Sequence, residues 1–95
     1  MNIRITDEAM TSDTTPHSAR LAGDGWAVTW LPGRVLTHNQ AITAMVLAET
    51  VAGGIGDHTD KRWLFIESWA DELGMTGADA VSKISYYGID LLAGE

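Results

Sequence analysis

Hydrophobic and polar residues alternate over the first third of the chain, and this pattern predicts short β-strands separated by turns. Residues 2–6 (NIRIT) alternate as in a short strand, and a polar run with a proline follows at 11–18. Residues 19–36 resemble strands interrupted by turns, with Asp24-Gly25 as a hairpin signal. One face of this stretch carries three large apolar residues that need a cover: Trp26, Val28 and Trp30.

After Thr37 the apolar residues recur with helical spacing. Thr37 and Gln40 have the spacing of a capping box, which predicts a helix over about residues 38–52, ended by Gly53-Gly54. The apolar residues of this helix cover more than half of its circumference, with Thr43 and Thr50 as the polar stripe and Leu47 intruding between them. A helix of this kind is expected to lie centrally, between the strands and other helices.

Two further helices are predicted before an apolar tail at 88–95. The first covers about residues 60–73 and stops at Gly74, and the second begins at Gly77, capped by Thr76, and runs to about Tyr87. The helix at 60–73 carries its apolar residues on one side: Trp63, Phe65, Ile66, Trp69, Ala70 and Leu73. We interpret this row as part of the core rather than as a binding face.

The order of elements, strands first and helices after them, predicts an α+β fold with a small antiparallel sheet (a hairpin or meander) and three helices packed on it. Residues 18–95 are expected to form this single domain. Residues 1–17 are expected to be a loosely ordered N-terminal segment, because their composition is polar and offers little to a core.

The segment WLPGR (residues 30–34) is interpreted as a structural turn. Pro32-Gly33 suits the centre of a type II turn, in which glycine takes a positive φ. This turn would direct Trp30 and Leu36 toward the first helix and leave Arg34 in water at its tip. Arg34 is therefore a candidate for contact with a partner.

Composition narrows the class of protein. The chain of 95 residues has 45% hydrophobic residues and four tryptophans, enough for one domain with a thin core. It has no cysteine, which excludes disulfides, thiolate metal sites and a cysteine nucleophile. The first ten residues lack the apolar run of a secretory signal, and no apolar stretch approaches the ~20 residues of a membrane span. We expect a soluble protein, and the absence of cysteine fits a reducing, intracellular compartment.

The formal net charge is −7, and residues 44–80 hold seven acids against Lys61 and Arg62. A surface of this sign repels phosphate backbones, so nucleic acid is disfavoured as a partner, whereas a basic protein surface is allowed.

Two charged residues fall within apolar sectors of their helices. Glu49 lies in the apolar arc of the first helix, where an unpaired carboxylate would be costly. Arg62 lies in the apolar sector and first turn of the second helix, where the helix dipole disfavours a cation. A short linker would bring the two helix ends together. We therefore predict a partly buried ion pair between Glu49 and Arg62; a solvent-exposed Glu49 and a catalytic Glu49 are the alternatives.

Other residues are candidates for partner binding. Asp60, Glu67 and Asp71 form an acidic row on the second helix, which could contact a basic partner or simply be a solvated face. Leu91 and Leu92 lie in the apolar tail, where they would dock onto the sheet or onto a second copy in a two-fold dimer.

Signals for catalysis and metal binding are weak. The three histidines are scattered along the chain, and Asp57-His58-x-Asp60 lacks further ligands. The sequence GGIG lacks the strand-then-helix setting of a phosphate loop, and no serine lies in an elbow or triad pattern. We therefore expect no enzyme activity, no metal and no cofactor. Residues 68–84 resemble a helix-turn-helix, although their second helix offers only Lys83 as a cation.

Residues 30–34 (WLPGR), 36–37 (LT), 39–41 (NQA), 43–45 (TAM) and 47–49 (LAE) together form a distinctive pattern. With the segment ELGMTGADAV, this pattern resembles small uncharacterised proteins of actinobacteria and of the phages that infect them, over roughly residues 24–84. The resemblance implies a bacterial host and a cytoplasmic setting, and it implies no catalytic residues.

These observations favour a non-catalytic protein-interaction module, encoded by or derived from a phage, that binds a bacterial host protein. The alternatives are a DNA-binding regulator of the helix-turn-helix type and a self-assembling structural protein.

Overall fold

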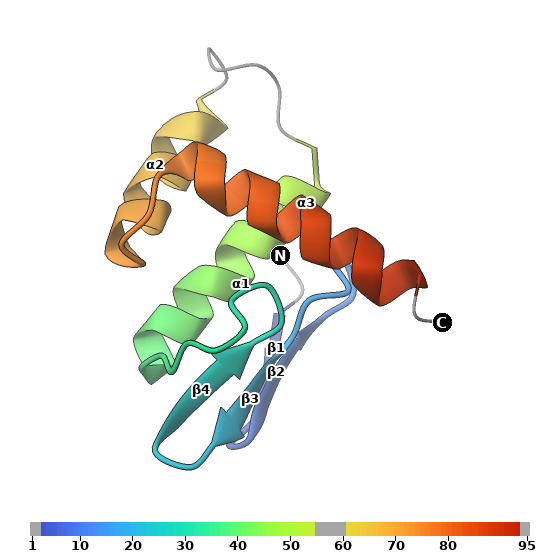
Figure 1. Cartoon of the computed structure of the whole chain (residues 1–95), viewed down its shortest axis with the longest axis vertical. Helices are drawn as coiled ribbons and strands as arrows, with labels where there is room; N and C mark the ends of the chain where they lie inside the picture. Colours follow the sequence, from blue (N-terminus) through green and yellow to red (C-terminus); the bar gives the residue numbers. More distant parts are fainter. Residues whose placement is uncertain (1–2, 55–60, 94–95) are drawn as a thin grey trace.

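The computed structural model describes residues 3–54 and 61–93, the last four of them by their backbone only. A four-stranded antiparallel sheet is followed by three helices, which confirms the predicted α+β class. The elements in chain order are β1 (Ile3–Ile5), β2 (Ala9–Ser12), β3 (Ala19–Ala22), β4 (Gly25–Val28), α1 (His38–Ala52), α2 (Arg62–Glu72) and α3 (Gly77–Ala93) (Figure 1).

The sheet is a meander with the order β1-β2-β3-β4, so each strand pairs with its neighbour in sequence. Its register aligns Met10 with Ala19 and Ala19 with Val28, and all three side chains are buried. The predicted hairpin is present, but its turn lies one residue earlier than Asp24-Gly25, because Gly25 already pairs with Ala22.

The N-terminal segment differs from the prediction. Residues 3–5 and 9–12, expected to be loosely ordered, form the first two strands of the sheet. Met10 is completely buried in the core, and β2 packs against α1. The alternation at residues 2–6 did indicate the first strand, but local composition gave no sign of β2 or of its place in the core, because short polar strands are stabilised by pairing and packing with other parts of the chain.

The helix signals are confirmed at the start of α1. Thr37 accepts a hydrogen bond from the Gln40 backbone N–H (3.1 Å), and the Gln40 side chain accepts one from the Thr37 N–H (2.9 Å). Thr76 caps α3 by accepting a hydrogen bond from the Asp79 N–H at 3.1 Å. However, α3 continues to Ala93, beyond the predicted end near Tyr87.

The extension of α3 passes through Gly88, which the sequence analysis placed in the tail. A Cβ at Gly88 would lie 3.4 Å from His17 Nε2, an ordinary van der Waals contact, so α3 passes next to the loop after β2 at this glycine. The cost of a glycine in a helix interior is about 1 kcal/mol, which the surrounding packing must offset.

The core lies where α1 meets the sheet on one side and the other two helices on the other (Figure 1). This central position of α1 agrees with the prediction from its apolar circumference. Trp30 is 0% exposed, and its Nε1–H donates to the Ala44 carbonyl of α1 at 3.2 Å. Leu47, expected to intrude into the polar stripe, is also fully buried.

The Pro32-Gly33 turn has the predicted form. Gly33 has a φ of +81°, and the Arg34 N–H donates to the Leu31 carbonyl at 3.3 Å across the turn. Leu36 then forms an isolated antiparallel bridge with Trp26 and is buried. The turn thus returns the chain to the edge of β4 before α1 begins.

Candidate functional site

Two pockets lie along the line where α1 and α2 pack against each other. The first has a volume of about 530 Å³ and the second about 400 Å³. The first is lined by Thr14, Glu49, Thr50, Gly53, Arg62, Phe65 and Trp69. The second is lined by Asn39, Gln40, Ile42, Thr43 and Glu72. The end of α1 and the start of α2 line the first pocket, whereas the start of α1 and the end of α2 line the second. The two helices therefore run in opposite directions, and we name the surface between them the α1–α2 groove.

The α1 wall of the groove is a single helical stripe. Asn39, Thr43, Val46, Thr50 and Gly53 follow one another at spacings of three or four residues, which places them on one side of the helix. The Thr43 hydroxyl donates to the Asn39 carbonyl at 3.1 Å, and the Thr50 hydroxyl donates to the Val46 carbonyl at 2.9 Å. Thr50 therefore directs its hydroxyl proton to its own helix, whereas the Thr43 hydroxyl shares its proton between the Asn39 carbonyl and Glu72 Oε2 of α2, at 3.2 Å.

The α2 wall carries two aromatic residues that were predicted to belong to the core, Phe65 and Trp69. Trp69 is partly buried and packs against the core as predicted, whereas Phe65 is exposed. Phe65 is 58% exposed, and its ring stacks on Trp69 with a centroid distance of 5.7 Å and an interplanar angle of 27°. In α2 the core side consists of Ile66 and Ala70. Phe65 is rotated about 100° from Ile66 around the helix, so its ring points out toward the groove.

Glu49 lies at the inner wall of the first pocket and is 5% exposed. The Ser12 hydroxyl, at the end of β2, donates to Glu49 Oε1 at 2.5 Å. The same Ser12 oxygen accepts hydrogen bonds from the backbone N–H groups of Thr14 (3.0 Å) and Thr15 (3.4 Å). The buried carboxylate thus connects the last turn of α1 to the sheet, a partner that the sequence analysis did not identify.

Arg62 lines the same pocket as Glu49 and donates a hydrogen bond to the Gly54 carbonyl at the end of α1. The structure therefore brings both residues of the predicted ion pair to one pocket. Their pairing stays a prediction that a double-mutant cycle can test.

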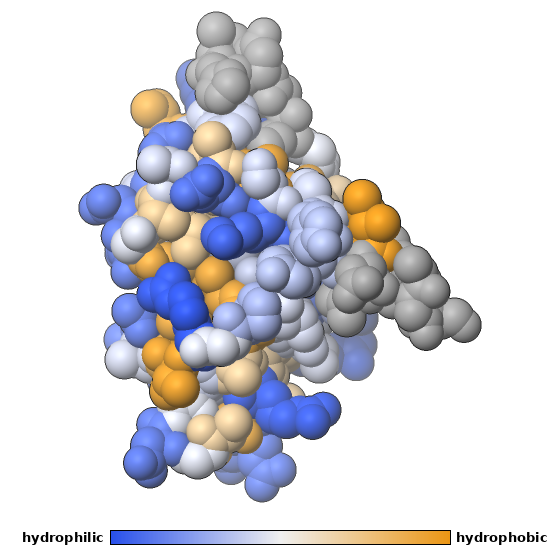
Figure 2. Space-filling view, in the orientation of Figure 1, coloured by the Kyte–Doolittle hydropathy of each residue, from blue (hydrophilic) through white to orange (hydrophobic). Residues whose placement is uncertain are grey.

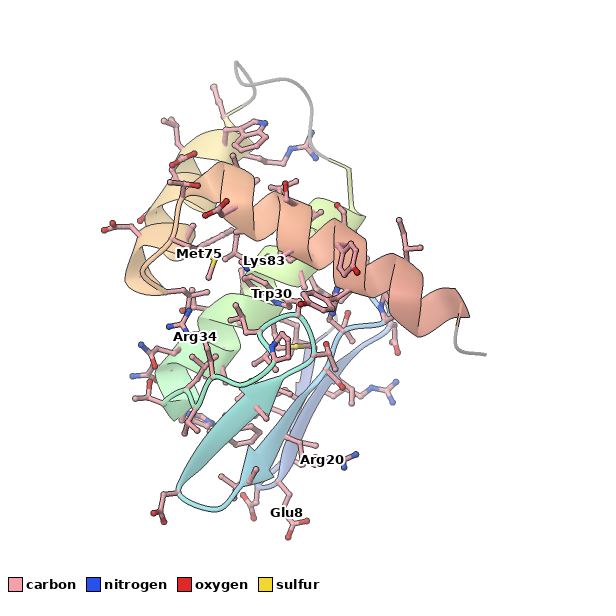
Figure 3. All side chains as sticks on the ribbon, in the orientation of Figure 1. Glu8, Arg20, Trp30, Arg34, Met75 and Lys83 are labelled. Carbon is pink, nitrogen blue, oxygen red and sulfur yellow. The ribbon has the colours of Figure 1, made fainter. Side chains whose placement is uncertain are left out.

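Those candidate partner-binding residues that the structure describes lie in different parts of the fold and do not form one site. Arg34 projects from its turn toward α2, where its Nη1 donates to the Leu73 carbonyl at 2.8 Å (Figure 3). Glu67 accepts a hydrogen bond from the Gly77 N–H at the start of α3 (3.4 Å). Asp71 is exposed on α2. Asp60 and the side chains of Leu91 and Leu92 lie outside the described residues.

Arg34 and Glu67 thus have roles within the fold that the sequence did not predict. Arg34 was expected to lie in water at the turn tip; it remains exposed, yet its guanidinium satisfies a carbonyl at the end of a helix. Glu67 was expected in an outward-facing acidic row, but its carboxylate lies at the N-terminus of the next helix, where the dipole favours an anion.

Glu49 and His17 are the two buried ionisable residues among residues 3–54 and 61–89. His17 is 1% exposed. Its Nε2–H donates to the Ile84 carbonyl of α3 (2.8 Å), and its Nδ1 is 2.7 Å from the Thr29 hydroxyl. Burial lowers the pKa of His17 below its ordinary value of 6.5, although the bond to the Ile84 carbonyl opposes this shift. The neutral imidazole therefore connects the loop after β2 to α3.

The part of the chain that the structure describes contains no group of three or more His, Asp or Glu residues arranged to hold a metal ion. None of the helices within residues 3–54 and 61–93 is both long and apolar enough to cross a membrane. On the face shown in Figure 2, apolar atoms form small groups among polar residues, and one group lies beside the C-terminal end of α3.

Comparison with models of protein families, with curated proteins and with solved structures found no match. The α1–α2 groove is the surface of the described residues that offers features for binding. Its features are the exposed Phe65 ring stacked on the partly buried Trp69, threonine hydroxyls that donate within the protein, and the carboxylates of Glu49 and Glu72 at the two ends.

Proposed function

We propose that this protein is a non-catalytic protein-interaction module that binds its partner through the α1–α2 groove. The observation that carries the proposal is the exposed Phe65 ring, stacked on Trp69 at the wall of a pocket of about 530 Å³. Aromatic residues in pockets of this kind supply much of the binding energy in protein interfaces. As the sequence pattern suggested, we take the partner to be a protein of the bacterial host.

The hydrogen bonds around Glu49 support a binding role over a catalytic one. The Ser12 proton is directed at Glu49, and the Ser12 oxygen already accepts two backbone N–H groups. This arrangement holds the Ser12 hydroxyl in a structural turn. A serine nucleophile would instead direct its oxygen at a substrate and its proton at a base.

The charges around α3 favour a protein partner over DNA. Buried Ala70 and a turn at Gly74 between α2 and α3 are features of a helix-turn-helix. However, the Glu67 carboxylate lies at the N-terminus of α3, and Asp79 lies in its first turn. A recognition helix uses this end to contact DNA, where two carboxylates would repel the phosphates.

Site-specific cross-linking tests the proposal. A photoreactive phenylalanine analogue at position 65 would be compared with the same analogue at Tyr86, which is 70% exposed on α3 and lies outside the groove. We expect the position-65 protein, expressed in an actinobacterial host, to form a discrete adduct identifiable by mass spectrometry. The position-86 protein should not form that adduct. Equal adducts from both positions, or none from position 65, would contradict the groove as the binding site.

A further inference from the structure

We infer that the groove accepts an amphipathic helix that carries a large apolar anchor and, two helical turns away on the same face, a lysine or arginine. The anchor enters the pocket beside Phe65 and Trp69, and the cation meets Glu72 at the second pocket. This inference rests on the proposed function and specifies the chemistry of the partner.

A helix fits the groove better than an extended segment because the groove walls offer few hydrogen bonds. The hydroxyls of Thr43 and Thr50 donate to carbonyls of α1, and the Gln40 side-chain oxygen accepts the Thr37 N–H. The walls are helices, whose internal backbone groups are already paired. An extended peptide would bury backbone N–H and C=O groups without partners, whereas a helix satisfies its own.

The spacing of the motif follows from α1. Thr50 lines the first pocket and Thr43 the second, and seven residues of helix separate them. Seven residues correspond to two turns, or roughly 10.5 Å along the axis. A docked helix that runs along the groove would therefore place residues i and i+7 over the two pockets.

The charge of the second residue follows from the end of α2. The Glu72 carboxylate lines the second pocket and accepts a hydrogen bond from the Thr43 hydroxyl at 3.2 Å. Asp71 is exposed next to it in sequence. Arg34 also reaches this end of α2, but its guanidinium is held on the Leu73 carbonyl. With a chain charge of −7, the second pocket favours a cationic side chain.

Three synthetic helical peptides of the same length would test the inference by NMR titration of isotope-labelled protein. The first carries a tryptophan and a lysine seven residues apart, the second has glutamine in place of the lysine, and the third has the lysine five residues from the tryptophan. We expect all three to shift amide signals of α1 and α2 at the groove. The first should bind about two- to fivefold more tightly than the others at low salt, as for an exposed ion pair.

Variants of the protein separate the ion pair from general attraction. Glu72→Gln should remove the advantage of the first peptide. Glu8→Gln should preserve that advantage, because Glu8 is exposed and lies at the far tip of the sheet (Figure 3). In 1 M salt, where the screening length is about 3 Å, the three affinities should converge.

Three results would overturn the inference while leaving the proposed function intact. These are equal affinities for the three peptides, an advantage that survives Glu72→Gln, and equally tight binding of a proline-interrupted version of the first peptide. Absence of peptide binding would also overturn the inference. In that case, the cross-linking experiment at position 65 tests the proposed function on its own. If the adduct at position 65 is absent as well, both the inference and the proposed function fail.

Discussion

Replacing Arg34 with alanine should destabilise the fold although the side chain is exposed. Its Nη1 donates to the carbonyl of Leu73, the C-cap residue of α2, at a distance of 2.8 Å. The last carbonyls of a helix lack partners within the helix, and a cation near them also interacts favourably with the helix dipole. Arg34→Ala removes both contributions and releases the Pro-Gly turn from α2.

The expected cost is about 1 kcal/mol. A hydrogen bond to a charged group is worth roughly 1.5–3 kcal/mol in a protected site. Because Arg34 is exposed, water competes for its guanidinium, so we expect a contribution below the lower end of this range. For a domain of this size, about 1 kcal/mol corresponds to a fall in melting temperature of roughly 4–8 °C.

Urea unfolding followed by tryptophan fluorescence would measure this change. Arg34→Lys, which keeps the charge and loses the planar donor group, should fall between wild type and Arg34→Ala. Arg20→Ala is the matched control, because Arg20 is exposed on β3 and points away from the helices (Figure 3). If Arg34→Ala stays within the ~0.5 kcal/mol typical of surface substitutions and matches Arg20→Ala, the bond to Leu73 does not stabilise the protein.

Four further predictions concern other parts of the fold. Gly33→Val should lower the free energy of unfolding by about 1 kcal/mol or more, because Gly33 has a φ of +81° that valine rarely adopts. An unchanged melting temperature would contradict this conformation of the turn. Because burial lowers the pKa of His17, the unfolded chain binds a proton more readily below pH 6.5. The free energy of unfolding should therefore fall more steeply between pH 6.5 and 5 in wild type than in His17→Gln, and parallel curves would contradict this. In a double-mutant cycle, combining Glu49→Gln with Arg62→Met should lower the free energy of unfolding by less than the sum of the two single effects. Strictly additive effects would mean that the two side chains do not interact. Light scattering over a concentration series should detect a dimer that is lost when residues 89–95 are deleted; a strict monomer whose stability is unaffected by the deletion would refute any docking of this tail.

Signals that act within a few residues were sufficient to predict much of the helical part. The capping box of Thr37 and Gln40, the cap at Thr76 and the turn at Gly33 are confirmed, because each depends on backbone groups within four residues. Alternation at residues 2–6 indicated β1, but β2 and its attachment to the core could not be predicted in this way. Met10 becomes a core residue only when β2 pairs with β3, the next strand, and packs on α1, which is distant in sequence.

The candidate site was only partly predictable for a related reason. Helical spacing placed Phe65 and Trp69 with Ile66 and Ala70 on one broad apolar side of α2. How much of that side is covered depends on the neighbouring helices, and they leave Phe65 58% exposed. Glu49 could be identified as an unusual carboxylate from its position in the apolar arc. Its partner Ser12 lies 37 residues away in sequence, so no local pattern identified it.

The way α2 is held supports its proposed role as a wall of a binding groove. In α2 itself, Ile66 and Ala70 are the buried residues, and polar contacts with other segments fix its position. These contacts are Arg34 to the Leu73 carbonyl, Arg62 to the Gly54 carbonyl, Thr43 to Glu72, and the Gly77 N–H to Glu67. These directional contacts hold α2 in place without covering Phe65, whereas Trp63 and Trp69 are partly buried against the core. Phe65 can therefore stay exposed at a defined position, and a groove with fixed walls loses less conformational entropy when a partner binds.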